Sequence, residues 1–258
     1  MSVPGGINPQ FLNLGFDPEE LFANGEYGGL YVPSDISTLW QDTAGTTPVT
    51  ASGQSIARID DKSGNGLNLI LTGGSGVTYG TDGNLHWIDF DGASYFETSA
   101  LTAPLMNNGE GSMAFSAASD QSEALAGVLA EQQAAPENSR RIVMFFDTRS
   151  GTKRHSFFSP DGTTRAIDLD SEIDGTAKVF IMSHDGSTAR GYIDNTAQSS
   201  TLTPGGSFNA SRFIQLGRQQ AGPFYFDGKL YGAVIRDTEL TTAQRNNLNA
   251  YLATKAGI

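Results

Sequence analysis

The stretch Phe213–Leu252, FIQLGRQQAGPFYFDGKLYGAVIRDTELTTAQRNNLNAYL, decides the fold, because it holds two strand patterns followed by a helix pattern. The runs Phe213–Leu216 and Phe224–Ile235 are short, apolar and rich in aromatic residues, which is typical of strands. Gly and Pro lie between the two runs, and an Asp-Gly pair at 227–228 adds a turn signal. We therefore predict β-strands in the first part of this stretch.

The last part of the same stretch predicts a helix. Thr241 and Gln244 have the spacing of a capping box, in which each side chain bonds the backbone of the other residue. Leu248, Tyr251 and Leu252 follow at the spacing of an apolar helix face, and Gly257 offers a C-terminal stop. We expect this helix to dock on the strands.

The rest of the chain repeats the strand pattern. Its 258 residues include 31 glycines and only 17% charged residues, and a hydrophobic content of 38% is enough to bury a core. Asp-Gly occurs six times and Asn-Gly three times, and such pairs favour tight hairpins. Between them lie further short apolar runs, namely LHWIDF at 85–90, IVMFF at 142–146 and KVFIM at 178–182. The sequence predicts an all-β fold, an antiparallel β-sandwich or jelly roll with a short N-terminal helix and a C-terminal helix.

Residues 1–29 are expected to form an arm ahead of a sandwich domain at 30–258. Asp17 and Pro18 have the N-cap and first-turn positions of a short helix that Gly25 would end. Two interpretations of the arm stay open, because it can fold against a partner surface or pack on its own sandwich. In the first case its apolar anchors are Phe11, Leu12, Leu14, Phe16, Leu21 and Phe22.

The formal net charge is −12, and the basic residues are unevenly spread. No Lys or Arg precedes Arg58, and six of the 16 lie between Arg140 and Arg165, where they meet an acidic partner or line the solvent face of strands. A chain this acidic repels phosphate backbones, so we expect no nucleic-acid partner. The first residues lack the pattern of a signal peptide and no apolar run is long enough to span a bilayer, so we expect no membrane insertion.

Three segments follow one another along the chain: WIDFDGASYFE at 87–97, KVFIMSHDGSTARGYIDNTAQ at 178–198, and the opening stretch. In this order they resemble the signature strand pair, the central hairpin, and the closing strands with terminal helix of laminin-G-like and concanavalin A-like lectin-glucanase jelly rolls. The resemblance covers roughly residue 54 to the end. It implies a concanavalin A-like jelly roll.

A fourth segment, GGLYVPSDISTLWQDTAGTTPVTASGQSIARIDDKSGNG at 28–66, is similar to one found at the front of such jelly rolls in structural proteins of tailed bacteriophages. This resemblance implies a virion protein assembled in the host cytoplasm, as a head decoration or spike, or as a tail or fibre component. Its partners would then be other capsid or tail proteins, held through the N-terminal arm, and further copies of the chain.

The stretch DLDSEID at 168–174 places acids at every second position. In the glucanases of the resembling family, Glu-x-Asp on a strand is followed by a further Glu, and the carboxyls act as nucleophile, helper and proton donor. Glu172 and Asp174 match the first two, but Thr176 and Ala177 stand where the acid should follow. We therefore expect no catalytic residue here. A calcium site is an alternative, and the exposed face of a half-buried strand is the preferred interpretation.

Three histidines, widely separated, and no cysteine leave little basis for a zinc site, so we expect no cofactor and calcium stays the one alternative. The main functional prediction is a non-enzymatic virion structural protein. The alternative is a lectin-like module that binds carbohydrate or a host receptor, because sugars stack on aromatic rings while polar groups fix their hydroxyls. Its candidate ligand-binding residues are Trp40, Arg218, Phe224 and Tyr225, of which Trp40 and Phe224 have core packing as a competing role. A glycoside hydrolase is the least favoured reading.

Overall fold

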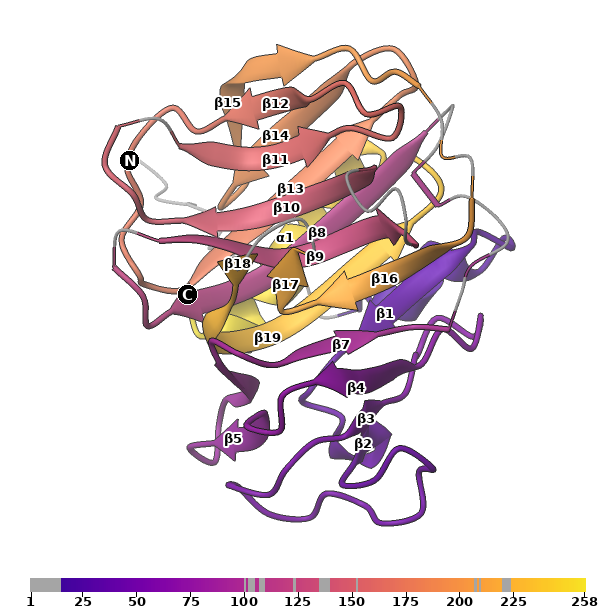
Figure 1. Ribbon diagram of the computed structural model, residues 1–258, viewed down its shortest axis with the longest axis vertical. Coiled ribbons are helices and arrows are strands. Elements are labelled where there is room, and N and C mark those ends of the chain that lie inside the picture. Colours follow the sequence, from indigo (N-terminus) through magenta and orange to yellow (C-terminus); the bar gives the residue numbers. More distant parts are fainter. Residues whose placement is uncertain are drawn as a thin grey trace, which may run out of the picture.

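The computed structural model describes residues 15–99, 101, 105–106, 110–122, 124–134, 140–151, 153–206, 208, 210–219 and 224–258. They form two large antiparallel sheets and a small two-stranded one (Figure 1). The eight-stranded sheet runs β15 (Thr196–Leu202), β14 (Ala189–Ile193), β13 (Lys178–His184), β8 (Gly111–Ser119), β19 (Asp227–Arg236), β6 (His86–Asp91) and β5 (Thr78–Thr81), with β1 (Gly28–Tyr31) also paired to β19. The nine-stranded sheet runs β12 (Arg165–Asp168), β11 (Arg154–Phe158), β10 (Arg141–Asp147), β9 (Leu125–Gln133), β16 (Arg212–Leu216), β7 (Tyr95–Glu97), β4 (Leu69–Gly73), β3 (Arg58–Ile59) and β2 (Leu39–Trp40). The predicted all-β sandwich is confirmed.

The main core lies between the two sheets, where the inward residues of each strand meet. Alternation along the strands explains the arrangement, since successive side chains point to opposite faces. Aromatic rings fill the centre: Phe115 stacks on Phe180 at 4.8 Å between ring centroids, and Phe146 contacts both Phe180 and Phe226. Burial of such large rings is a principal source of stability in a β-sandwich.

A second cluster covers the outer face of the eight-stranded sheet. Helix α1 (Thr242–Ala256) places Leu248 and Leu252 against strand residues that include Val179 and Ile181. Its start is the predicted capping box, in which Thr241 and Gln244 bond each other's backbone, and Gly257 ends it in the left-handed region. In Figure 1 α1 lies behind the strands, on the side away from the nine-stranded sheet.

The predicted N-terminal helix is present as a 3-10 helix, η2 (Pro18–Phe22), with the Asp17 side chain accepting from the Glu19 amide. Leu21 and Phe22 are only 1% and 7% exposed, because they pack in the same cluster as α1. Phe16 packs at its margin, edge-on to Tyr251. These three side chains therefore contact the chain's own sandwich, as the second interpretation of the arm predicted, which corrects their assignment as partner anchors. Three further expected anchors lie outside the described residues, namely Phe11, Leu12 and Leu14.

The expected domain boundary between residues 29 and 30 falls inside β1. Gly28 pairs with Arg236 and Gly29 with Ile235, so both residues belong to the sheet. Residues 16–29 are part of the packed sandwich rather than a separate arm.

The remaining short elements are η3 (Ile36–Thr38) and a two-stranded hairpin, β17 (Arg218–Gln219) and β18 (Phe224–Tyr225). The hairpin lies in front of β9 in Figure 1, on the outer face of the nine-stranded sheet. The two outer faces therefore differ, since one is covered by α1 and the other carries this hairpin.

Candidate functional site

Two glycines place the β17–β18 hairpin on the nine-stranded sheet. Gly217 ends β16 with a φ of 90°, in the left-handed region that favours glycine, and so directs the chain out of the sheet. Gly127 of β9 lies beneath the hairpin, where an added Cβ would be 2.7 Å from both the Cβ and the backbone nitrogen of Gln219. The backbone of β17 therefore lies directly on β9, and only glycine allows that approach.

The hairpin and β7 hold an arginine between two tyrosines, which we name the tyrosine–arginine site (Tyr95, Arg218 and Tyr225). The Arg218 guanidinium carbon lies 4.4 Å from the ring centroid of Tyr95 and 5.4 Å from that of Tyr225. The two rings are 6.4 Å apart and tilted by 55°. Such cation–π contacts hold the guanidinium plane beside the two rings.

The Tyr95 ring is supported from the neighbouring strand. Tyr95 pairs with Gly73 of β4, and a Cβ on Gly73 would be 2.3 Å from the Tyr95 ring. Burial raises the pKa of the Tyr95 hydroxyl above its ordinary value, while the nearby charge of Arg218 lowers it. The hydroxyl is therefore a neutral donor and acceptor at physiological pH. Two residues along β7, Glu97 accepts a 2.7 Å hydrogen bond from the Gln215 amide and adds a carboxylate to this face.

The structure brings together three of the four predicted ligand-binding residues. Arg218, Phe224 and Tyr225 are half-buried members of one hairpin, in which Phe224 pairs with Gln219. Tyr95 was missed by sequence reasoning. The one signal that could have found it is Gly73, since a glycine within a strand often accommodates a ring from the next strand.

Trp40, the fourth predicted residue, lies on β2 at the far edge of the same sheet. Its indole Nε1 donates to Asp60 Oδ2 at 2.7 Å, and Asp60 Oδ1 accepts from Arg58 Nε at 2.6 Å. The ring is half-buried and faces outward, because the preceding Leu39 points into the core. Trp40 is therefore separate from the tyrosine–arginine site but on the same face of the sheet.

Only Asp168 of the acidic stretch at 168–174 lies in a strand, and the remaining acids lie in the loop after β12. The prediction of a half-buried strand is therefore wrong for most of the stretch. Asp168 pairs with Arg154, Asp170 with the backbone of Ser199, Glu172 with Lys153 and Asp174 with Thr176. Glu172 and Asp174 are 65% and 68% exposed. Each of these carboxylates thus has its own local donor.

Among the residues that the structure describes, no group of three or more His, Asp or Glu side chains has the geometry of a metal site. His155 is fully buried against Phe180, and burial lowers its pKa to about 4. His86 contacts the Tyr79 hydroxyl through Nδ1 at 2.5 Å on the other sheet. The histidines lie in three separate places.

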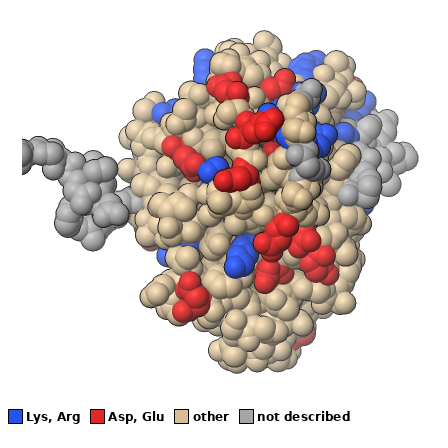
Figure 2. Space-filling view, turned by 90° about the vertical axis from the view of Figure 1, so that its left-hand side faces the viewer, with Lys and Arg blue, Asp and Glu red and all other residues tan. Residues whose placement is uncertain are grey.

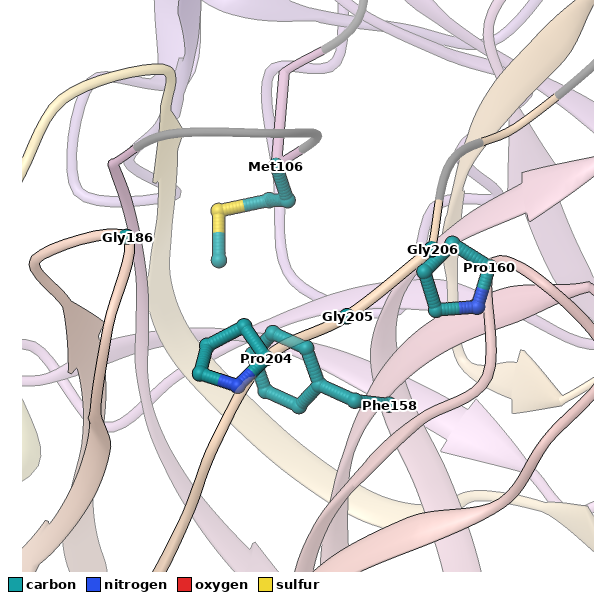
Figure 3. Close-up of a pocket in the computed structure, with 7 residues that line it drawn as sticks. All are labelled: Met106, Phe158, Pro160, Gly186, Pro204, Gly205 and Gly206. Carbon is teal, nitrogen blue, oxygen red and sulfur yellow. The ribbon is translucent and has the colours of Figure 1, made fainter.

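A cavity of about 230 Å³ lies between loops at one end of the sandwich (Figure 3). Met106 extends on one side of the space, and the rings of Phe158 and Pro204 lie on the other. Its lining is completed by Pro160, Gly186, Gly205 and Gly206. These seven residues offer no titratable side chain, so the cavity supplies apolar contact and backbone polar groups but no acid or base.

The charged side chains are mixed over the surface. Figure 2 shows one side of the molecule, where acidic side chains gather in several groups with lysines and arginines between them. Many of these charges are paired locally, as Arg165 with Asp161 and Arg190 with Asp185. In the described part of the chain, no helix has the length and apolar character needed to cross a bilayer.

No protein-family model matches this sequence, and no curated protein matches it either. Solved structures do match. Domain 4 of AbnA, a GH43 extracellular arabinanase from Geobacillus stearothermophilus in complex with arabinotriose, is similar with a TM-score of 0.56 and 16% identity, over 87% of this chain and 98% of that one.

Two larger enzymes are similar over part of their length. An arabinofuranosidase complexed with arabinofuranosyl-alpha-1,2-xylobiose gives a TM-score of 0.64 and 11% identity, over 93% of this chain and 65% of that chain. Trypanosoma rangeli sialidase in complex with sialic acid gives a TM-score of 0.56 and 11% identity, over 88% of this chain and 33% of that chain. At such low identities these likenesses show the fold alone: the chain is a β-sandwich jelly roll.

Proposed function

We propose that this protein is a non-catalytic carbohydrate-binding module whose ligand lies on the tyrosine–arginine site. The observation that carries the proposal is Arg218 held at 4.4 and 5.4 Å from two tyrosine rings, on the sheet face that α1 leaves uncovered. Aromatic faces bind the apolar faces of sugar rings, and a fixed guanidinium fork and phenolic hydroxyls bind their oxygens. The solved structures described above support it, since two of them are complexes with arabinose-containing ligands and another is a complex with sialic acid.

The absence of catalysis belongs to the same proposal. Glu172 and Asp174 form local contacts with Lys153 and Thr176, an arrangement suited to loop structure rather than to proton donation across a glycosidic bond. Reducing-end release from arabinan or xylan that disappears in Glu172→Gln would overturn this part.

A glycan array followed by titration calorimetry tests the proposal. Arg218→Ala should weaken binding of the best array ligand at least tenfold, which is about 1.4 kcal/mol. The matched control is Arg245→Ala, because Arg245 also stacks on a tyrosine, 4.2 Å from the Tyr192 ring, but on the face covered by α1. Arg245→Ala should bind normally. Equal affinity of the Arg218→Ala variant and the parent chain would refute the assignment of the site.

The virion assignment predicted from residues 28–66 is a second proposal, and it rests on that sequence resemblance. It is compatible with the first, because many copies on one particle would turn weak glycan contacts into avid attachment to a host surface. A protein gel of purified intact particles tests it, and absence of the chain from them would exclude it.

A further inference from the structure

Four half-buried side chains form a row across the outer face of the nine-stranded sheet. The register pairs Trp40 with Arg58, Arg58 with Ile70, and Ile70 with Glu97. Each of these residues neighbours a fully buried core residue in the chain, Leu39, Ile59, Leu69 and Phe96 respectively. Side chains alternate along a strand, so the four all point outward. The row therefore leads from Trp40 to the edge of the tyrosine–arginine site, where Tyr95 shares the outer face of β7.

Trp40 is held in place before any ligand arrives. Its Nε1 is bonded to Asp60, whose other oxygen is bonded to Arg58, and Arg58 Nη1 donates to the Ala44 carbonyl at 3.3 Å. The Arg58 and Asp60 side chains are 24% and 29% exposed. An indole with its N–H already satisfied presents its ring face as a stacking surface and loses little entropy on binding.

The distance between Trp40 and the tyrosine–arginine site sets the length of the ligand. Trp40 and Tyr95 are separated by three strand spacings and two residues along the strand, or roughly 16 Å. A single sugar ring is much shorter than this distance, whereas a chain of several linked rings covers it.

We infer that Trp40 is a second contact point in an extended site, which takes a linear oligosaccharide laid across the strands from Tyr225 and Tyr95 to Trp40. The inference rests on the proposed function and narrows the ligand to chains of several units. Along this path Ile70 supplies apolar contact, while Glu97 and the Arg58–Asp60 pair supply acceptors and donors for hydroxyls.

The test uses arabino- and xylo-oligosaccharides from the disaccharide to the hexasaccharide. Affinity should rise with length until the chain reaches Trp40, by about tenfold or more over the disaccharide. Trp40→Ala should remove that gain and leave disaccharide binding unchanged. The control is Trp87→Ala, because Trp87 is the second tryptophan of the chain, half-buried beside Lys229 on the eight-stranded sheet.

A second measurement needs no loss of the Trp40 side chain. In Trp87→Phe, Trp40 is the single tryptophan, so its fluorescence should change with the hexasaccharide and not with the disaccharide. Disaccharide binding that does not tighten with length, with Trp40 fluorescence constant, overturns the extended site and leaves the proposed function standing. If no arabino- or xylo-oligosaccharide binds at any length, the extended site is overturned. If the glycan array shows no bound ligand at all, the proposed function is overturned as well.

Discussion

At the residue scale, Glu131 is a charge placed inside the sandwich. It is fully buried on β9, where its carboxylate accepts from Arg212 Nε at 2.8 Å and from the backbone amides of Leu105 and Met106 at 3.1 and 2.8 Å. Burial raises the pKa of Glu131, and these donors act against that rise. The carboxylate ties the segment that carries Met106, a lining residue of the end cavity, to the sheet.

Removing the arginine should expose the cost of this burial. We expect Arg212→Met to lower the free energy of unfolding by about 3 kcal/mol at pH 7, because it leaves an uncompensated buried carboxylate. A raised native pKa means that stability falls as pH rises through it, so the deficit should shrink towards pH 4, where Glu131 becomes protonated. Urea unfolding at both pH values measures this. The double variant with Glu131→Gln should recover much of the loss, and an equal deficit at both pH values would contradict the account.

Within the described residues, Asp227 is a carboxylate without a compensating cation, so its replacement should stabilise the fold. Burial raises the pKa of its carboxyl, and the charges of Asp120, Asp91 and Asp89 raise it further. A carboxyl with a raised native pKa costs stability above that pKa, so Asp227→Asn should raise the thermal midpoint at pH 7 by about 1–2 °C, after allowance for solvent screening. Near pH 3 the gain should vanish.

The matched control for Asp227 is Asp185, whose pKa is lowered by hydrogen bonds from the Ser187 hydroxyl and the Thr188 and Ser187 amides. A carboxyl with a lowered native pKa stabilises the fold at pH values above its ordinary pKa. This stabilisation is lost as the pH falls through the native pKa. Asp185→Asn should therefore lower the midpoint at pH 7. If the thermal midpoints of Asp227→Asn and Asp185→Asn shift in the same direction, the local surroundings of the two carboxyls do not determine their effect on stability.

At the element scale, the acidic stretch at 168–174 joins the edges of the two sheets. β12 and β15 are the edge strands of different sheets, and Asp170 accepts the Ser199 amide of β15 at 2.7 Å, while the Asp168 amide donates to Ser200 Oγ. β15 reads TAQSSTL and has no charged residue to discourage pairing with another chain. The loop that contains Asp170 thus protects this edge.

Asp170→Ala should therefore weaken the fold and expose the β15 edge. We expect a loss of about 1 kcal/mol and concentration-dependent association, measured by chemical unfolding and by light scattering. The control is Glu172→Ala, because Glu172 lies in the same loop, is 65% exposed and pairs with Lys153 rather than with β15. Monodisperse behaviour of Asp170→Ala at every concentration would show that the carboxylate does not protect the edge.

The contact of β17 with β9 makes the tyrosine–arginine site depend on Gly127. In Gly127→Ala the new Cβ would lie 2.7 Å from Gln219, so the hairpin must move outward and carry Arg218 with it. We expect a stability loss of about 1–3 kcal/mol and weaker glycan binding. Gly15→Ala is the control, since its Cβ would meet no atom within 4 Å. Unchanged binding in Gly127→Ala would mean that the hairpin position does not set the site.

Local signals in the sequence predicted the elements better than the site. The capping box at Thr241 and the apolar strand runs depend on residues close in the chain, and the structure confirms them. Arg218 and Tyr225 are predicted from their residue types, because aromatic rings stack on sugars and polar groups fix the hydroxyls. The contact of Tyr95 with Arg218 is not predicted, because the two residues are distant in sequence and meet only through the pairing of β7 with β16 and the placement of β17. Gly73 is the one signal in the sequence for the Tyr95 ring. The acidic stretch alternates like a strand, but its acids bond loop and edge donors instead.

At the scale of the whole molecule, one helix-and-strand layer stabilises the face opposite the site. The segment from Phe16 to β1 closes this layer together with α1, so deleting residues 1–26 would remove part of a core as well as any anchor. Single substitutions separate the packing role of this segment from its proposed anchoring role. We expect Leu21→Ala to cost about 2–5 kcal/mol, because Leu21 is 1% exposed among aliphatic and aromatic neighbours.

Chemical unfolding measures that loss, and Glu20→Ala is its control, since Glu20 is exposed in the same helix and should change stability little. A Leu21→Ala variant as stable as the parent chain would show that η2 is dispensable to the fold and would restore the arm as a free anchor. Anchoring itself is then tested by replacing Phe11, Leu12 and Leu14 with Ser and measuring occupancy on purified particles. Normal occupancy of a chain that unfolds at the parent's denaturant midpoint would rule out anchoring through these residues, because the sandwich would be intact and only the proposed contact would be missing.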